Sequence, residues 1–342
     1  MDPSRPIILL VALLLATTCA STTLPIAAGI SVEAADQSLH IQYLGTGGYL
    51  IRRGADVLLT APFFSNPSLA RLAFAKITAD TVRIDSILQR LEPLQPARAI
   101  LVGHAHYDHL MDLPHIAARH ATEARIYGSQ TAVNTLSAVL PADRLVAVDQ
   151  NAGTDQTAGT WHYPTADSLC RFMALKADHA PHVALGPIRL KFFKGRILQP
   201  LEQLPQRAWG WKEGRTLAYL IDFLRPDGGI QFRLHYQDAA SAPPQGFPPL
   251  DPRPVDVAIF CVPGAEKIRA YPDSIARRLN PRHAVLGHWE DFFRPWTDNA
   301  AELRPVPRTD PRDLIQSLTE AVPHSTWTLP RPGGWLYIEE AD

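Results

Sequence analysis

The sequence predicts an α/β (α+β) protein in which helices cover β-sheets. Its 342 residues and 46% hydrophobic content are enough for a large buried core. Short apolar, β-branched runs alternate with segments whose apolar residues recur at helical spacing, most clearly between residues 81 and 148. The net charge of −1 argues against a nucleic-acid partner. We expect one folded domain over residues 36–342.

The first 28 residues have the order of a secretory signal peptide. A basic residue precedes the apolar run 7–16, and small residues follow up to Ala20 and Ala28, after either of which cleavage fits the pattern. The run is shorter than a membrane span, although an uncleaved anchor is an alternative. We therefore expect an exported protein of the bacterial periplasm, with lipoprotein anchoring through Cys19 as a minor alternative.

The expected strands are runs rich in β-branched and aromatic residues, bounded by turn residues such as those at 45–48, 53–56 and 226–229. The expected helices have apolar residues on one face, and Ser129 can cap one of them. The strands cover residues 39–44, 49–52, 57–60, 99–102, 125–128, 145–148, 171–176, 188–193, 217–223, 230–236, 255–262, 282–289 and 335–338, and the helices cover residues 81–91, 113–120, 129–140, 274–279 and 313–320.

Three histidines and an aspartate fall within six residues, and they directly follow the buried run 99–102. In an extended chain alternate side chains point the same way, so His104 and His106 can reach one metal ion. Asp108 and His109 follow where the chain turns, and they can reach a neighbouring ion. Imidazole and carboxylate ligands suit zinc without a thiolate. The sequence therefore predicts a metal site at the end of a central strand.

This cluster resembles the His-X-His-X-Asp-His signature of the metallo-β-lactamase-fold hydrolases, and the resemblance extends from about His40 to the C-terminus. It implies a four-layer αββα sandwich with one or two metal ions at the edge of the two sheets. The ending Gly287–Trp289 looks closest to the branch of N-acylphosphatidylethanolamine phospholipase D and the ascorbate-phosphate lactonases. Two positions depart from the family: Thr60 replaces an aspartate at the end of the third strand, and Gln237 replaces a glycine.

The resemblance also implies which side chains bind metal. The third histidine of the first ion is His179, which directly follows a strand, or its competitor His182. A bridging aspartate is expected after residue 236, and the mid-strand Asp222 is expected to be structural. The implied ligands are His104, His106 and His179 for one ion, Asp108, His109 and His288 for the other, and Asp238 as the bridge.

The resemblance implies a hydrolase that uses two zinc ions, with manganese or iron as alternatives. Two ions about 3.5–4 Å apart share a hydroxide that attacks a phosphodiester, ester or lactone. Asp108 is the expected catalytic residue, because it would bind metal and orient the hydroxide. Flavodiiron relatives usually carry a glutamate where His106 stands, which disfavours redox chemistry. True metallo-β-lactamases generally lack a bridging aspartate, so Asp238 disfavours antibiotic hydrolysis.

We expect a small-molecule or lipid-like substrate, which leaves peripheral membrane association open, and the sequence does not predict an oligomeric state. Two non-enzymatic alternatives remain: a metal-binding protein without turnover, and an envelope scaffold with the same fold. Segment 194–215 has little periodicity, and we interpret it as a lid, with surface packing of Trp209 and Trp211 as the alternative.

Several other residues have two interpretations. Cys170 and Cys261 either pair or remain buried free thiols. His115 and His120 are expected to be ordinary helix or surface residues. Two aromatic groups either line the substrate side or pack in the core: Phe63, Phe64 and Phe74, and Trp289, Phe292, Phe293 and Trp296.

Overall fold

The computed structural model describes residues 24–27, 38–185 and 188–340. Most of the expected signal peptide, residues 1–28, lies outside the described residues, as does the expected domain start at residue 36. The described residues contain no helix with both the length and the apolar character needed to cross a bilayer. Export and the domain boundaries therefore stay predictions.

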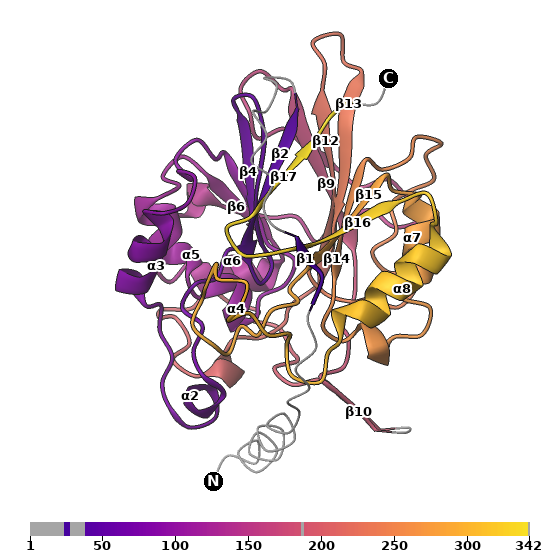
Figure 1. Ribbon diagram of the computed structural model, residues 1–342. Coiled ribbons are helices and arrows are strands. Elements are labelled where there is room, and N and C mark those ends of the chain that lie inside the picture. The colour runs from indigo at the N-terminus through magenta and orange to yellow at the C-terminus, as the bar shows by residue number, and fades with distance from the viewer. Residues whose placement is uncertain (1–23, 28–37, 186–187, 341–342) are drawn as a thin grey trace.

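Two large β-sheets lie face to face at the centre of the molecule (Figure 1). The first consists of β1 (Ile26–Ala27), β8 (Trp161–His162), β9 (Cys170–Lys176), β12 (Leu217–Leu224), β13 (Ile230–Tyr236), β14 (Val257–Cys261), β15 (His283–Gly287) and β16 (Thr326–Pro330). The second consists of β2 (Leu39–Gly45), β3 (Gly48–Arg53), β4 (Asp56–Thr60), β5 (Ala99–Leu101), β6 (Arg125–Gly128), β7 (Leu145–Ala147) and β17 (Trp335–Ile338). Their orders are β1-β16-β15-β14-β13-β12-β9-β8 and β17-β2-β3-β4-β5-β6-β7.

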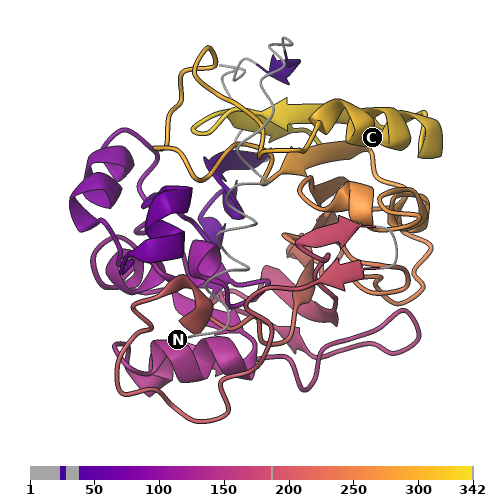
Figure 2. The same ribbon diagram turned by 90° about the horizontal axis from the view of Figure 1, so that it is seen from below.

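Helices cover the outer face of each sheet, which completes four layers (Figure 1 and Figure 2). The helices are α2 (Leu69–Phe74), α3 (Thr81–Leu88), α4 (Tyr107–Leu110), α5 (Leu113–Arg119), α6 (Gln130–Leu136), α7 (Asp273–Leu279) and α8 (Pro311–Ala321). The first five lie on the side of the seven-stranded sheet, and α7 and α8 lie on the side of the eight-stranded sheet. Short 3₁₀ turns occur at Ala142–Arg144, Ala208–Gly210 and Ala265–Lys267, and β10 (Val183–Leu185) pairs with β11 (Ile188–Leu190) in a separate hairpin.

The layers follow from the alternation of side chains along the strands. Leu50 and Leu59 belong to the core cluster that contains residues of α3, α5 and α6. Ile51 and Leu58, one residue away, belong to the cluster between the two sheets, which also reaches α7 and α8. Both faces of the central strands are therefore buried, and the expected αββα sandwich is confirmed.

The sequence located the elements better than their ends. Ser129 caps α6, because its hydroxyl oxygen accepts the backbone N–H of Ala132 at 3.3 Å, but the helix ends at Leu136 rather than at residue 140. The helix predicted for residues 81–91 ends at Leu88. The hairpin of β12 and β13 is confirmed.

Strand direction brings several carboxyl ends to one edge of the sandwich. Both β9 and β13 are antiparallel to β12, so they run in the same direction. β14 is parallel to β13, and β15 is parallel to β14. The end of β5 is tied to the start of β12, because the Leu217 N–H donates to the Gly103 carbonyl at 2.7 Å. Residues that follow β5, β9, β13 and β15 therefore meet at this edge.

Candidate metal centre

Four strand ends and one short helix bring the seven expected ligand side chains together. The backbone at His106 is extended, with ψ of 162°, so the alternation expected from the sequence holds up to the start of α4. Asp108 and His109 lie in the first turn of that helix. The remaining ligands are His104 after β5, His179 after β9, Asp238 after β13 and His288 after β15.

The first group consists of three imidazoles. The ring centroids lie 4.6 Å apart for His104 and His106, 4.8 Å for His104 and His179, and 5.0 Å for His106 and His179. One nitrogen from each ring lies within 4.8 Å of the others. Three imidazole nitrogens that converge in this way can bind one divalent ion.

The second group consists of Asp108, His109 and His288. Oδ2 of Asp108 lies 3.4 Å from Nε2 of His109 and 3.4 Å from Nε2 of His288. Asp238 lies between the groups, with Oδ1 3.2 Å from Nδ1 of His104 and Oδ2 3.2 Å from Nδ1 of His109. Each oxygen of the Asp238 carboxylate therefore faces a different group.

The chemistry of these side chains fits bound metal. Nε2 of His106 and Nε2 of His109 are buried, and neither atom has a hydrogen-bond partner among the described residues. A buried polar atom left unpaired costs about 1–3 kcal/mol, so a ligated ion would remove a real penalty. Burial also lowers the pKa of His104 and of His179 to about 4, so both rings are neutral at pH 7, as metal ligands must be.

The two carboxylates are held in their charged form. Burial alone would raise the pKa of Asp108, but the neighbouring His109 and His288 hold it below its ordinary value. The pKa of Asp238 is also lowered against the effect of burial, in this case by His109 and His104. Burial would lower the pKa of His109, yet the charges of Asp108 and Asp238 raise it above its ordinary value.

Residues missed at the sequence level hold Asp238 and His288 in place. The Tyr236 hydroxyl lies 3.1 Å from Oδ2 of Asp238. The backbone of His288 is left-handed, with φ of 58°, a conformation that non-glycine residues adopt mainly under constraint. Its N–H donates to the Tyr43 hydroxyl at 3.0 Å, and that hydroxyl donates to Glu290. No sequence pattern marks the contacts of Tyr43 with His288 and Glu290, because these partners are far apart along the chain.

The two departures from the family pattern do not prevent this arrangement. The Thr60 hydroxyl donates to the Gly47 carbonyl at 2.5 Å and accepts the Tyr49 N–H at 2.8 Å. Gly47 packs directly on His109, since an added Cβ would lie 2.7 Å from its Cε1 atom. Thr60 thus supports the site through the β2–β3 turn. Gln237 is buried, and the next residue still reaches the site.

The geometry favours His179 over His182 as the third imidazole. His182 stacks on His179, with ring centroids 4.9 Å apart, but it is not part of the convergent group. Its Nδ1 atom accepts the N–H of Phe192 at 3.1 Å, which commits that nitrogen to another contact. The full ligand assignment stays a prediction.

The aromatic residues mostly pack in the core rather than line a substrate site. Phe63, Phe64 and Trp289 are fully buried. Phe292 makes an edge-to-face contact with His288, with ring centroids 4.8 Å apart, so it borders the metal centre. Trp211 is also buried, in the core cluster on the helical side of the seven-stranded sheet.

Other expected residues have structural roles or form a separate cluster. Asp222 is fully buried and pairs with Arg171 and Arg233, as expected of a structural carboxylate. Cys170 and Cys261 are buried free thiols. His115 and His120 both contact Asp85, since Nε2 of each lies within 2.7 Å of its Oδ1 atom. The three residues form a partly exposed cluster whose side chains are of the kinds that bind metal.

Comparisons with known proteins agree with this fold. Residues 66–198 match the family model of the beta-lactamase superfamily domain. The metallo hydrolase Igni18 from the archaeon Ignicoccus hospitalis is 14% identical, with 89% of this chain and 100% of that chain aligned at a TM-score of 0.52. The metallo-beta-lactamase fold protein YhfI from Bacillus subtilis is also 14% identical, with 87% and 99% aligned at a TM-score of 0.48.

More distant similarity extends to CmlA, a diiron β-hydroxylase from Streptomyces venezuelae. It is 13% identical, with 88% of this chain and 54% of that chain aligned at a TM-score of 0.43. No curated protein matches the sequence. The likeness to Igni18 supports the metallo-hydrolase fold, while the expected branch within the superfamily stays a prediction.

Proposed function

We propose that this chain is a hydrolase of the metallo-β-lactamase superfamily and that it depends on two metal ions. The observation that carries this proposal is the pair of buried ligand groups joined by Asp238, whose two oxygens face His104 and His109. When bound, two divalent ions supply a water of lowered pKa and stabilise negative charge on a substrate oxygen.

Zinc is the ion that we propose for both groups. Imidazole and carboxylate donors suit zinc, and the same donors also accept manganese and iron. Neither Cys170 nor Cys261 belongs to a convergent ligand group among the described residues. Elemental analysis of the purified protein identifies the ion directly.

Asp108 is the residue that we propose to orient the attacking water. Its carboxylate is buried and ionised, with Oδ2 toward His109 and His288. An ionised carboxylate only accepts hydrogen bonds, so it fixes the direction of a water O–H and can take up its proton. The neutral amide of Asp108→Asn loses that capacity while keeping the size of the side chain.

The proposed reaction is hydrolysis of a phosphodiester, an ester or a lactone. The test is turnover of bis(p-nitrophenyl) phosphate, p-nitrophenyl acetate and a simple lactone by the zinc-loaded protein. We expect Asp108→Asn to lower kcat by about 10²–10⁴ on the accepted class. His115→Ala, which lies outside the site, is the matched control and retains activity. Stoichiometric zinc without turnover of any class would favour a metal-binding protein without catalysis.

We also propose that the protein is exported, on the basis of its first 28 residues, and that its substrate is a small or lipid-like molecule. Expression of the full chain in a bacterium, followed by cell fractionation and mass determination of the mature N-terminus, tests this. Recovery from the periplasm with the leader removed is the expected result. An intact N-terminus in the cytosolic fraction would contradict export.

A further inference from the structure

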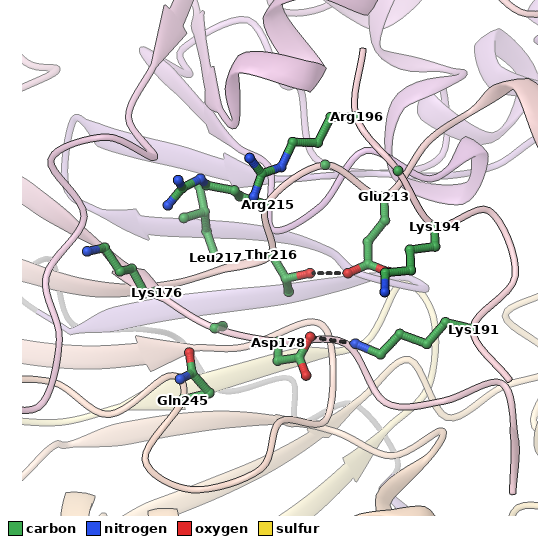
Figure 3. Close-up of a pocket in the computed structure, with 13 residues that line it drawn as sticks. Lys176, Asp178, Lys191, Lys194, Arg196, Glu213, Arg215, Thr216, Leu217 and Gln245 are labelled. Carbon is green, nitrogen blue, oxygen red and sulfur yellow. Dashed lines mark hydrogen bonds and ion pairs between the residues drawn. The ribbon is translucent and has the colours of Figure 1, made fainter. Parts of the chain in front are cut away.

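A charged cavity lies beside the candidate metal centre. Its volume is about 510 Å³, which is within the range of small-molecule sites. Its walls come from three segments: residues 176–178 at the end of β9, residues 191 and 194–196 after β11, and residues 213–217, which lead into β12 (Figure 3). Gln245 completes the lining.

The cavity carries an excess of positive charge. Two carboxyl groups line it, those of Asp178 and Glu213, and Asp178 pairs with Lys191 at 2.5 Å. Arg215 is partly compensated by Asp149, at 3.5 Å. No carboxylate of the described residues pairs with the remaining three cations. The basic side chains of the lining are Lys176, Lys191, Lys194, Arg196 and Arg215.

Glu213 gives this cavity a buried polar group that needs a partner. The side chain is 7% exposed, and its Oε2 atom has no hydrogen-bond partner among the described residues. Burial raises the pKa of Glu213, which favours the protonated form. A protonated carboxyl donates a hydrogen bond, so Glu213 can face an anion as a donor rather than repel it.

The cavity wall is bonded to the loop that carries two candidate metal ligands. The Glu213 carbonyl accepts the N–H of Ala105, between His104 and His106, at 2.9 Å. On another wall, Asp178 directly precedes His179. A molecule held in the cavity therefore lies next to the first ligand group.

We propose that this cavity binds a phosphate group of the substrate, separate from the bond that is cleaved. The inference rests on the proposed hydrolase function for its catalytic meaning. A single carboxylate would neutralise only one of the three unpaired cations, whereas a phosphate dianion offers two charges and several acceptor oxygens to lysine and guanidinium donors. Lys176, Lys194 and Arg196 are exposed to water in the free protein, so a neutral lactone or acyl ester would gain nothing from their charges, whereas a phosphate would. The substrate class narrows to phosphate-bearing esters.

Calorimetric titration of the zinc-loaded protein with glycerol 3-phosphate, and with glycerol as the uncharged probe, tests the cavity. We expect Lys194→Gln combined with Arg196→Gln to weaken glycerol 3-phosphate binding by about tenfold or more. The matched control is Lys76→Gln combined with Arg98→Gln, which removes the same charges from exposed positions outside the cavity. Glu213→Gln, which keeps a donor, should bind at least as tightly as the wild type.

A soluble ester and a lipid headgroup present the same phosphate. The second arm is therefore sedimentation with phosphatidylcholine vesicles, with and without phosphatidic acid. Weaker binding of glycerol 3-phosphate by the cavity variant supports the inference and identifies a soluble phosphate ester as the ligand. Weaker binding of the phosphatidic acid vesicles supports it and identifies a lipid headgroup. Equal binding by the cavity and control variants in both arms would overturn it. These readouts do not require turnover, so failure of the hydrolase proposal would appear separately, as zinc-loaded protein that cleaves no substrate.

Discussion

Gly103 lies directly against the carboxylate of Asp238, and a methyl group at Gly103 would overlap both carboxylate oxygens. The two residues are 135 positions apart in the chain, yet the glycine provides the space in which the bridging carboxylate sits. The same glycine accepts a backbone hydrogen bond from Leu217, so its position is fixed on that side. The absence of a side chain at residue 103 is therefore a condition of the metal centre.

Gly103→Ala should reduce the metal content of the protein while leaving its fold intact. The added methyl group pushes the Asp238 carboxylate away from His104 and His109, because the three nearest atoms that it meets all belong to that side chain. Gly128→Ala is the control, since its new Cβ would meet only aliphatic and backbone atoms at 3.1 Å and beyond. Circular dichroism and elemental analysis separate the effects. Full metal content in Gly103→Ala would contradict this role.

Asp222→Asn should lower the stability of the protein and keep its metal, whereas Asp238→Asn should lose the metal. Asp222 neutralises Arg171 and Arg233 in the sheet, and removal of one partner of a buried ion pair typically costs about 3–5 kcal/mol of unfolding free energy. Asp238→Asn removes the charge that faces both ligand groups and should abolish stoichiometric metal binding. Urea unfolding and metal analysis of both variants check this, and metal loss in Asp222→Asn alone would reverse the assignment.

The sequence predicted the sandwich and the members of the site for identifiable reasons. The central strands are short, almost continuously apolar runs, and a histidine-rich loop that follows a buried strand has few other interpretations. His179, Asp238 and His288 were predicted as ligands from the resemblance to the metallo-β-lactamase-fold hydrolases, combined with the position of each shortly after a strand. These features are local, so they can be read without knowledge of the tertiary structure.

The supporting contacts could not be predicted in the same way. The packing of Gly103 on Asp238 and the hydrogen bond from His288 to Tyr43 join distant segments, and no local pattern encodes them. Aromatic residues were ambiguous because composition does not distinguish a core from a cavity wall. The cavity itself is lined by charges from three segments, which are unremarkable until the fold brings them together.

His179→Ala should lose one metal ion, whereas His182→Ala should retain both. His179 converges with His104 and His106, while His182 only stacks on His179. Loss of a supporting residue typically weakens metal affinity by about 10–100-fold without changing the stoichiometry at saturation. Zinc titration at saturating concentration distinguishes the two variants. The reverse pattern would make His182 the ligand.

Acidification should release metal from the two groups in a defined order. Protons compete with metal for imidazole nitrogen, and the pKa values of His104 and His179 near 4 delay that competition in the first group. The pKa of His109 is instead raised by Asp108 and Asp238, so protons compete there at higher pH. The group of Asp108, His109 and His288 should therefore empty first as pH falls. Dialysis across a descending pH series with metal analysis checks this, and simultaneous release would contradict it.

The central claim is that this chain holds two metal ions at the edge of its sheets, and the metal content of purified protein tests it most directly. We predict about two zinc ions per chain for the wild type and fewer for His106→Ala. Wild-type protein purified without chelator that holds no stoichiometric metal, even after zinc is added, would contradict the account.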